Sequence, residues 1–367
     1  MKILVVTGRF GNVFTGGIER VSYEVTKRLG KKHEIQVIAH KRFQDENTTT
    51  EFPIVTISSF NVPKTNFWVY YYLYKKKQLV KKHIKNFQPD ILYAHNPYDT
   101  YASIGLGVPV VSHIHSLYTE NFITQDSLRT FLPKIYWNWF WKFRLHVENE
   151  ALSKSNLVIT YSDYLAELAK KRGAKKIKII PNGIDTKIFC TSGKKSNLLK
   201  KPSVIFIGRI EKIKGIDYLI EAARQLSEIN FYLIGEQKDK YDFPKNMILL
   251  GKKHPNQIPE FLRSADIFIN PVLRDGFEIV NIEAMACGIP VITTDNFERS
   301  KIYKGVTFFI KSNDTNSIVF AIKKLLTDSS LVDNFISKGL NFSSQYDWDG
   351  ISPQIEKELV KINLGNK

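Results

Sequence analysis

Short apolar segments rich in Val and Ile alternate with helix-type segments along almost the whole chain. The segments that read as buried strands are residues 3–7, 35–39, 54–57, 90–94, 109–113, 156–160, 177–180, 204–207, 231–234, 247–250, 265–270, 291–293 and 306–310. Most are separated by segments whose apolar residues recur at helical spacing. A strand followed by a helix usually returns to the same sheet in parallel. The alternation therefore predicts an α/β protein with parallel sheets.

The chain is long enough for two such sheets. It has 367 residues, and a single core rarely grows beyond about 250–300 residues. A turn at 181–185, P-N-G-I-D, is followed by a polar stretch, 191–201, that carries four lysines. Turn residues and polar segments are typical of linkers. We therefore expect one domain over residues 1–184 and a second over 185–346.

The charge balance predicts an anionic partner. Lys and Arg outnumber Asp and Glu by 53 to 36, which gives a net charge of +17. Such a surface suits nucleic acid, an anionic membrane or phosphorylated substrates. The only two cysteines, Cys190 and Cys287, fit no metal spacing and imply a reducing compartment. Because no segment reaches the roughly 18 apolar residues of a membrane span, we expect a cytoplasmic protein, possibly peripheral on the inner membrane face.

Two loops of the N-terminal half stand where ligands bind in α/β sheets. Gly16 and Gly17 lie between the first strand and a helix, which is the position of phosphate-binding loops, although they do not form G-x-G-x-x-G. They are also compatible with a simple turn. His113 and His115 stand at the carboxyl end of another strand, 109–113, and we favour His115 as the functional one because it lies further beyond the strand end. The other histidine is then packed or solvated.

The C-terminal half offers cations and carboxylates in equivalent places. Arg209 and Lys214 occupy a strand-to-helix loop, where an Arg fork, a Lys charge and a helix N-terminus suit a pyrophosphate. Asp275 and Glu283 bracket the start of a later helix whose free N–H groups can hold an anion. An ordinary structural loop and helix would have a similar sequence, so these residues indicate a binding site only when they are considered together.

Two helix-type segments mix aromatic and basic residues, from Phe67 to Lys82 and from Phe131 to Arg144. This mixture is typical of a membrane interface, where rings lie at headgroup level and lysines meet anionic lipid. Aromatic packing on the sheet with solvated lysines is the plainer alternative. A nucleic-acid surface is a third, but no recognised motif accompanies the charge, so we expect no nucleic-acid partner.

Four motifs occur in one order: G-G-I-E-R at 16–20, P-N-G-I-D at 181–185, G-R-I-E-K-I-K-G at 208–215 and D-G-F-E-I-V-N-I-E-A-M-A-C-G-I-P-V at 275–291. Together they resemble the family 4 retaining glycosyltransferases over nearly the whole chain. The resemblance implies the GT-B fold, with two Rossmann-like domains whose parallel sheets face each other across a deep cleft. It also implies that the last helix, within 347–367, returns to the N-terminal domain.

The resemblance further implies a nucleotide-sugar donor, UDP- or GDP-linked, on the C-terminal domain and a saccharide or lipid-linked acceptor on the N-terminal domain, with no metal ion and no cofactor. Catalytic roles would fall to Asp275, His115, Arg209 and Lys214. Glu283 would bind the ribose, and Glu19 and His115 would meet the acceptor. The other expected donor contacts are Gly16, Gly17, Gly276, Phe277, Glu278, Ile279 and Val280.

Two positions depart from the family pattern. The first acid of its E-x7-E pair is Asp275, and Glu278 replaces a glycine. We therefore expect hexose transfer with an unusual sugar preference. A catalytically silent sugar-nucleotide or glycan-binding protein and a nucleotide-sugar epimerase are the alternatives.

Overall fold

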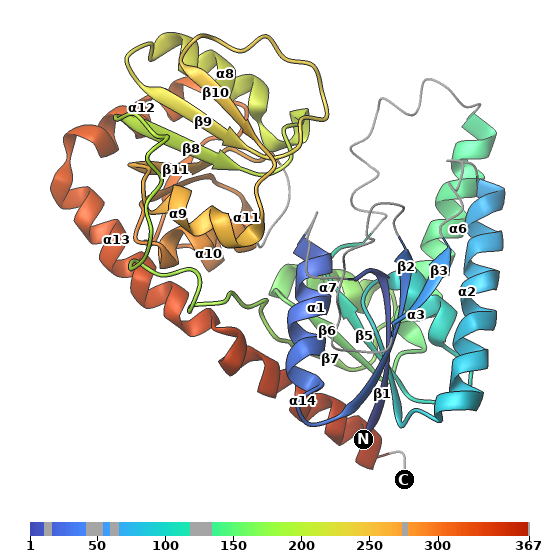
Figure 1. The fold of residues 1–367 in the computed structure, drawn as a ribbon. Helices are drawn as coiled ribbons and strands as arrows, with labels where there is room; N and C mark the ends of the chain where they lie inside the picture. Colours follow the sequence, from blue (N-terminus) through green and yellow to red (C-terminus); the bar gives the residue numbers. More distant parts are fainter. Residues whose placement is uncertain (11–16, 42–53, 59–65, 118–133, 274–277, 366–367) are drawn as a thin grey trace. The chain divides into compact units, whose positions relative to one another are not determined.

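The computed structural model describes all residues except 11–16, 42–53, 59–65, 118–133, 274–277 and 366–367 (Figure 1). Contacts between Cα atoms divide the chain into two compact units. The first consists of Met1–Asn182 and Ile351–Lys367, and the second of Gly183–Gly350. Each unit holds one parallel sheet with helices, so the predicted α/β class is confirmed.

The first unit contains a seven-stranded parallel sheet in the order β3-β2-β1-β4-β5-β6-β7. The strands are β1 (Lys2–Arg9), β2 (Glu34–Lys41), β3 (Ile54–Ser58), β4 (Ile91–Ala94), β5 (Val110–Ile114), β6 (Leu157–Thr160) and β7 (Ile177–Ile179). The central strands are buried along their length because helices cover both faces. The strand order reverses between β1 and β4, which is where open sheets of this kind bind ligands.

The helices of the first unit are α1 (Gly17–Leu29), α2 (Asn66–Phe87), α3 (Pro97–Ser103), α6 (Lys134–Ser153), α7 (Asp163–Lys171) and α14 (Trp348–Leu364). From Ile351 onward, α14 belongs to this unit. Its Glu356 accepts hydrogen bonds from Lys32 at 3.0 Å and faces His33 Nε2 at 3.1 Å, in the turn between α1 and β2. The α2 helix contains the aromatic and basic segment from Phe67 to Lys82, and α6 contains the described part of the other, from Lys134 to Arg144.

The second unit repeats the topology with six parallel strands in the order β10-β9-β8-β11-β12-β13. They are β8 (Ser203–Ile207), β9 (Asn230–Ile234), β10 (Met247–Gly251), β11 (Ile267–Asn270), β12 (Val291–Thr294) and β13 (Phe308–Ile310). Around them lie α8 (Ile216–Gln225), α9 (Ile258–Leu262), α10 (Ile279–Ala286), α11 (Phe297–Ile302), α12 (Thr315–Thr327) and α13 (Ser329–Ser343). The order reverses between β8 and β11.

The P-N-G-I-D turn crosses the boundary between the units, and its Gly183 and Ile184 have a packing role in the second unit. The Ile184 amide donates to the Tyr346 carbonyl at 2.7 Å, and the Trp348 amide donates to the Ile184 carbonyl at 3.0 Å. A Cβ at Gly183 would lie 2.6 Å from the fully buried Trp348 ring. The polar stretch 191–201, expected as a linker, also lies within this unit, where Arg263 donates to the Lys194 carbonyl at 3.1 Å.

Candidate active site

The loops after β8 and β11 leave the carboxyl ends of neighbouring strands at the point where the order of the second sheet reverses. The first loop contains a short 3₁₀ helix, η1 (Lys212–Lys214). It ends at Gly215, which has φ +74° and whose absent Cβ would lie 2.1 Å from the Pro271 carbonyl oxygen. Only glycine allows this approach. The glycine of the G-R-I-E-K-I-K-G motif therefore brings Lys214 against the loop that follows β11.

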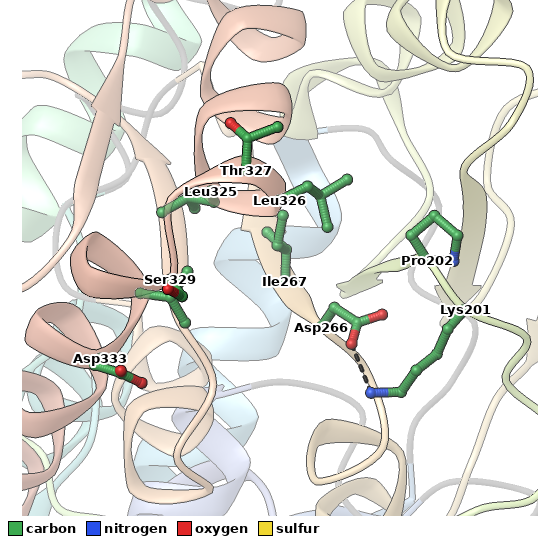
Figure 2. Close-up of a pocket in the computed structure, with 10 residues that line it drawn as sticks. Lys201, Pro202, Asp266, Ile267, Leu325, Leu326, Thr327, Ser329 and Asp333 are labelled. Atoms are coloured by element: carbon green, nitrogen blue, oxygen red, sulfur yellow. Dashed lines mark hydrogen bonds and ion pairs between the residues drawn. The ribbon is translucent and has the colours of Figure 1, made fainter.

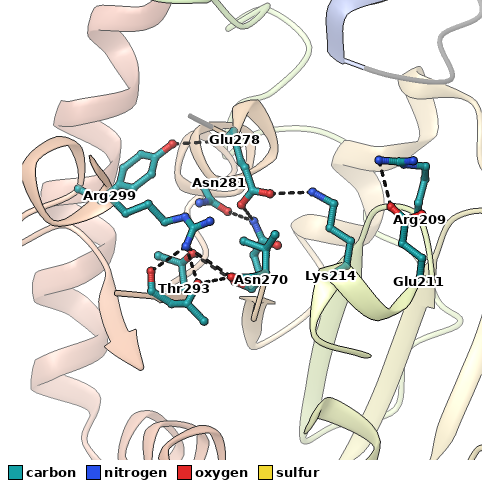
Figure 3. Close-up of polar contacts among 11 residues, drawn as sticks. Arg209, Glu211, Lys214, Asn270, Glu278, Asn281, Thr293 and Arg299 are labelled. Atoms are coloured by element: carbon teal, nitrogen blue, oxygen red, sulfur yellow. Dashed lines mark hydrogen bonds and ion pairs between the residues drawn. The ribbon is translucent and has the colours of Figure 1, made fainter. Parts of the chain in front are cut away.

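Lys214 forms an ion pair with Glu278 (Figure 3). Its Nζ lies 3.0 Å from Glu278 Oε1, and the two side chains are only 15% and 10% exposed. Asn270, the last residue of β11, donates to the other carboxylate oxygen of Glu278 and to Asn281 Oδ1 at 2.9 Å. Tyr303 donates to the Glu278 main-chain oxygen at 3.3 Å. Glu278 thus turns inward to neutralise Lys214.

Arg209 lies in the same loop but pairs with a different carboxylate. Its guanidinium is 3.0 Å from Glu211 Oε1, and the side chain is 54% exposed (Figure 3). Arg209 is therefore a solvated cation with room to turn, whereas Lys214 is held. The structure brings Lys214 and Glu278 together, and it places Arg209 on the same loop with a separate partner.

The helix α10 carries the remaining predicted donor contacts. Glu278 precedes it in extended conformation, and Ile279 and Val280 form its first turn, half-buried. Glu283 lies one turn further and is 4% exposed. Burial raises the pKa of the neighbouring Cys287 to about 12, with a further contribution from Glu283. Predictions for Asp275, Gly276 and Phe277 fall on residues outside the described part of the chain.

In the first unit the carboxyl ends of β4 and β5 bring three histidines together. His95 follows β4, His113 lies in β5 and His115 follows it, and the exposed fractions are 0%, 1% and 8%. His95 Nδ1 lies 3.3 Å from His115 Nε2, and Tyr93 Oη lies 2.6 Å from His113 Nδ1. Burial lowers the pKa of His115 to about 3 and the pKa values of His95 and His113 well below their usual range.

The other predicted residues of this unit lie at the start of α1. Gly17 is its first residue and is exposed, and Glu19 lies in its first turn and is half-buried. Gly16 lies outside the described residues. Sequence reasoning overlooked Asn270 and His95. Both stand at the carboxyl end of a strand beside a reversal of strand order, and that criterion, applied to every strand, would have found them.

A separate open pocket of about 560 Å³ lies elsewhere in the second unit (Figure 2). Lys201, Asp266 and Ile267 line it at the amino ends of β8 and β11, together with residues of α12 and α13. Lys201 Nζ lies 2.6 Å from Asp266 Oδ1. Because ligands of parallel sheets bind at the carboxyl ends, this pocket does not correspond to the site around Lys214.

Comparison with known proteins agrees with this architecture. The chain is 24% identical over 369 residues to an uncharacterized glycosyltransferase, MJ1178, of Methanocaldococcus jannaschii, covering 95% of this chain and 96% of the relative. It is 31% identical over 189 residues to the UDP-Gal:alpha-D-GlcNAc-diphosphoundecaprenol alpha-1,3-galactosyltransferase of Escherichia coli, covering 44% of this chain and 48% of that protein.

Solved structures show the same fold. Sucrose-phosphate synthase from Thermosynechococcus elongatus superposes with a TM-score of 0.83 at 16% identity, covering 100% of both chains. Anabaena HepE in complex with UDP-glucose gives a TM-score of 0.73 at 18% identity, covering 98% of this chain and 100% of that one.

Two family models match successive parts of the sequence. The model described as Glycosyltransferase Family 4 matches residues 15–188, and the model described as Glycosyl transferases group 1 matches residues 191–342. Between them they span both units and every motif quoted above. The chain is a glycosyltransferase enzyme with the GT-B fold and belongs to the family 4 glycosyltransferases.

Proposed function

We propose that the enzyme transfers a hexose from a UDP- or GDP-sugar to a saccharide or lipid-linked saccharide, with retention of anomeric configuration and without a metal ion on the pyrophosphate. The observation that carries the proposal is the half-buried Lys214, held by Glu278 where the second sheet reverses its strand order. A lysine in this position supplies a fixed positive charge for a phosphate. Similarity to HepE, which was solved with UDP-glucose, supports a nucleotide-sugar donor.

In the proposed complex the pyrophosphate takes over the positive charge that Glu278 neutralises in the free enzyme. Lys214 and Arg209 bind the diphosphate, and the N–H groups at the start of α10 add their dipole. Arg209 can turn toward the diphosphate because its own side chain is 54% exposed. Glu283 binds the ribose hydroxyls. For Gly17 and His115 the roles predicted from the sequence stay predictions.

The proposed chemistry follows from the charge that develops on the leaving group. As the anomeric C–O bond breaks, the nucleoside diphosphate gains negative charge, which fixed cations stabilise. The sugar acquires oxocarbenium character. The acceptor hydroxyl then attacks from the same face and gives its proton to the leaving phosphate oxygen. Trapping a covalent sugar on the enzyme would contradict this route.

A panel of UDP-, GDP- and ADP-sugars tests donor use. We expect one sugar of the UDP or GDP series to raise the thermal melting temperature by mass action and to be hydrolysed slowly without an acceptor. The Glu283→Ala variant should lose the shift, because the ribose loses its acceptor. Glu221→Ala, which changes an exposed acid on α8, serves as the matched control. The assignment is contradicted if no donor raises the melting temperature or if Glu283→Ala keeps the full increase. Binding without turnover indicates a silent binding protein.

We also propose that the first unit binds an anionic membrane on its cytoplasmic face. Tyr71 and Tyr74 of α2 and Trp139 of α6 are exposed. Exposed Lys75 lies 5.3 Å above the Tyr71 ring. Rings beside lysines suit the headgroup region. No described helix is long and apolar enough to cross a bilayer.

Sedimentation with lipid vesicles tests the membrane surface. The wild type should bind phosphatidylglycerol vesicles more strongly than phosphatidylcholine vesicles, and salt should weaken the binding. A Tyr74→Ser and Trp139→Ser double variant should bind at least about tenfold more weakly because two interfacial rings are lost. Phe320→Ser, which removes an exposed ring from α12, should leave binding unchanged. Equal binding of both variants would rule out this surface.

A further inference from the structure

The three histidines of the first unit owe their proximity to the pairing of two parallel strands. β4 and β5 pair Tyr93 with Val111 and Ala94 with Ser112, so the next residues along, His95 and His113, are neighbours. His115 lies two residues beyond His113, and side chains at that spacing share one face of a strand. All three rings are buried. One nitrogen from each ring lies within 4.8 Å of the corresponding nitrogens of the other two.

Among the residues that the structure describes, three ring nitrogens of the cluster have no hydrogen-bond partner. His113 uses Nδ1 for Tyr93, and His95 Nδ1 faces His115 Nε2. The nitrogens that remain are His113 Nε2, His95 Nε2 and His115 Nδ1, each of them buried. Buried polar atoms are nearly always satisfied. Each ring therefore keeps one buried nitrogen that no described residue satisfies, and the cluster can exchange its internal hydrogen bond for a bound group when the rings turn.

We propose that His95, His113 and His115 form a binding site for a late first-row divalent metal ion, with Zn²⁺ as the reference ion. Neutral imidazole is a preferred ligand of zinc, copper and nickel, whereas magnesium and calcium prefer oxygen. Within the described residues the group contains neither thiolate nor carboxylate. Three histidines leave the fourth position of a tetrahedral ion open to water or an exogenous ligand.

The distances are compatible with such an ion. Two nitrogens bound tetrahedrally to one zinc at about 2.0–2.1 Å lie about 3.3 Å apart, and His95 Nδ1 and His115 Nε2 are already 3.3 Å apart. The widest nitrogen separation, at most 4.8 Å, must shorten by about 1.5 Å to reach the same value. Side-chain rotation at a strand end supplies movements of this size without any change in the sheet.

The competing interpretation is a histidine pair that is only hydrogen-bonded. The rings of His95 and His115 differ in plane by 4°, with centroids 5.6 Å apart, and this edge-to-edge geometry suits an N–H···N bond in the metal-free chain. A hydrogen bond between neutral rings contributes far less free energy than a three-histidine metal site. We therefore expect an available ion to replace this bond by turning the two rings toward it.

Tyr93 orients His113, one of the three proposed ligands. Its hydroxyl holds His113 Nδ1 at 2.6 Å, which leaves the buried Nε2 for another partner. Metal-binding histidines usually have such a partner on the other ring nitrogen, and removal of that partner weakens metal affinity by about 10–100-fold. Tyr93 itself is fully buried. It is therefore a positioning residue and not a ligand.

Metal binding by untagged, full-length enzyme tests the proposal. After chelator treatment, Zn²⁺ is titrated in competition with a chromophoric chelator, and Co²⁺ binding is followed by visible absorption. We expect one ion per chain and a Co²⁺ spectrum typical of tetrahedral nitrogen coordination. His113→Asn should lower the affinity by more than about 100-fold, and Tyr93→Phe by about 10–100-fold. His146→Asn changes an exposed histidine on α6 and should have no effect.

If a variant fails to fold, the Co²⁺ absorption spectrum of the wild type still tests the proposal. Absence of a bound ion in the wild type, or unchanged affinity in folded His113→Asn, would show that the cluster is hydrogen-bonded packing only. The inference does not depend on the proposed donor chemistry, because its readout is metal binding. If the metal site and the predicted role of His115 in sugar transfer are both correct, Zn²⁺ bound to the His115 ring inhibits transfer, and a chelator restores the activity.

Discussion

Replacing Lys214 by alanine is expected to lower kcat/KM for sugar transfer by about 10²–10³-fold, the usual effect of removing one fixed donor of charge stabilisation. The reason is the position of Lys214. Its ammonium is held at 3.0 Å from Glu278 and is only 15% exposed, so its charge is poorly screened and requires little reorganisation when the diphosphate leaves. A steady-state assay with the donor identified from the panel measures the loss.

The neighbouring Lys212 provides a matched control for this prediction. It lies two residues away in the same 3₁₀ helix but is exposed, so Lys212→Ala should change kcat/KM by less than about twofold, because exposed charges are well screened. Lys214→Arg should recover part of the activity, since it keeps the charge but not the geometry. Equal losses in the Lys212 and Lys214 variants would contradict the proposed role.

Loss of activity must also be separated from loss of structure. Lys214→Ala leaves Glu278 as a half-buried carboxylate without its cation, which destabilises the fold. The double variant Lys214→Met and Glu278→Gln removes both charges and should recover most of the melting temperature. If its activity stays low, the Lys214 charge acts on the reaction. If activity returns with stability, Lys214 has only a structural role.

Replacing Lys76 by methionine is expected to destabilise the first unit by about 3–5 kcal/mol, the usual cost of breaking a buried ion pair. Lys76 is fully buried in α2 and forms an ion pair with Asp99 of α3. It also donates to the Thr7 carbonyl and to the Tyr72 hydroxyl, both at 3.1 Å. Urea unfolding followed by tryptophan fluorescence measures the loss, because four of the five tryptophans lie in this unit.

The effect of this substitution should grow with pH. Burial raises the pKa of Asp99, while the charge and hydrogen bond of Lys76 lower it in part. Without Lys76 the folded-state pKa of Asp99 rises further, so the protonated form is favoured in the folded state. A carboxyl whose pKa is raised in the folded state contributes stability at low pH, and this stability is lost as the pH rises above the pKa of the carboxyl in the unfolded chain. The variant should therefore be closer to wild type at pH 5 than at pH 8.

Two further variants decide whether the ion pair is responsible. Lys75→Met changes the exposed neighbour of Lys76 and should alter the free energy of unfolding by less than about 0.5 kcal/mol. Lys76→Met combined with Asp99→Asn removes both charges and should recover much of the lost stability. A double variant as unstable as Lys76→Met would attribute the loss to packing and not to the unpaired carboxylate.

The run Lys75-Lys76-Lys77 shows what local sequence could not resolve. In isolation the three lysines look like one solvated basic patch, and that was the plainer prediction for this helix. In the structure Leu73, Lys76 and Val80 share the inward face of α2, and Asp99 comes from another helix to pair with Lys76. The pairing depends on a contact between residues 23 positions apart, which periodicity does not reveal.

The alternation of strands and helices was sufficient to predict the two parallel sheets, because it allows few other topologies. The need for glycine at positions 215 and 183 comes from the packed fold, because a Cβ at either position would collide with a residue remote in sequence. The same packing explains why Glu278 neutralises Lys214, why Lys76 is buried, and why His95 joins His113 and His115. Those facts depend on which strand ends and helices meet, and distances between residues remote in sequence are set by the packing of the whole unit.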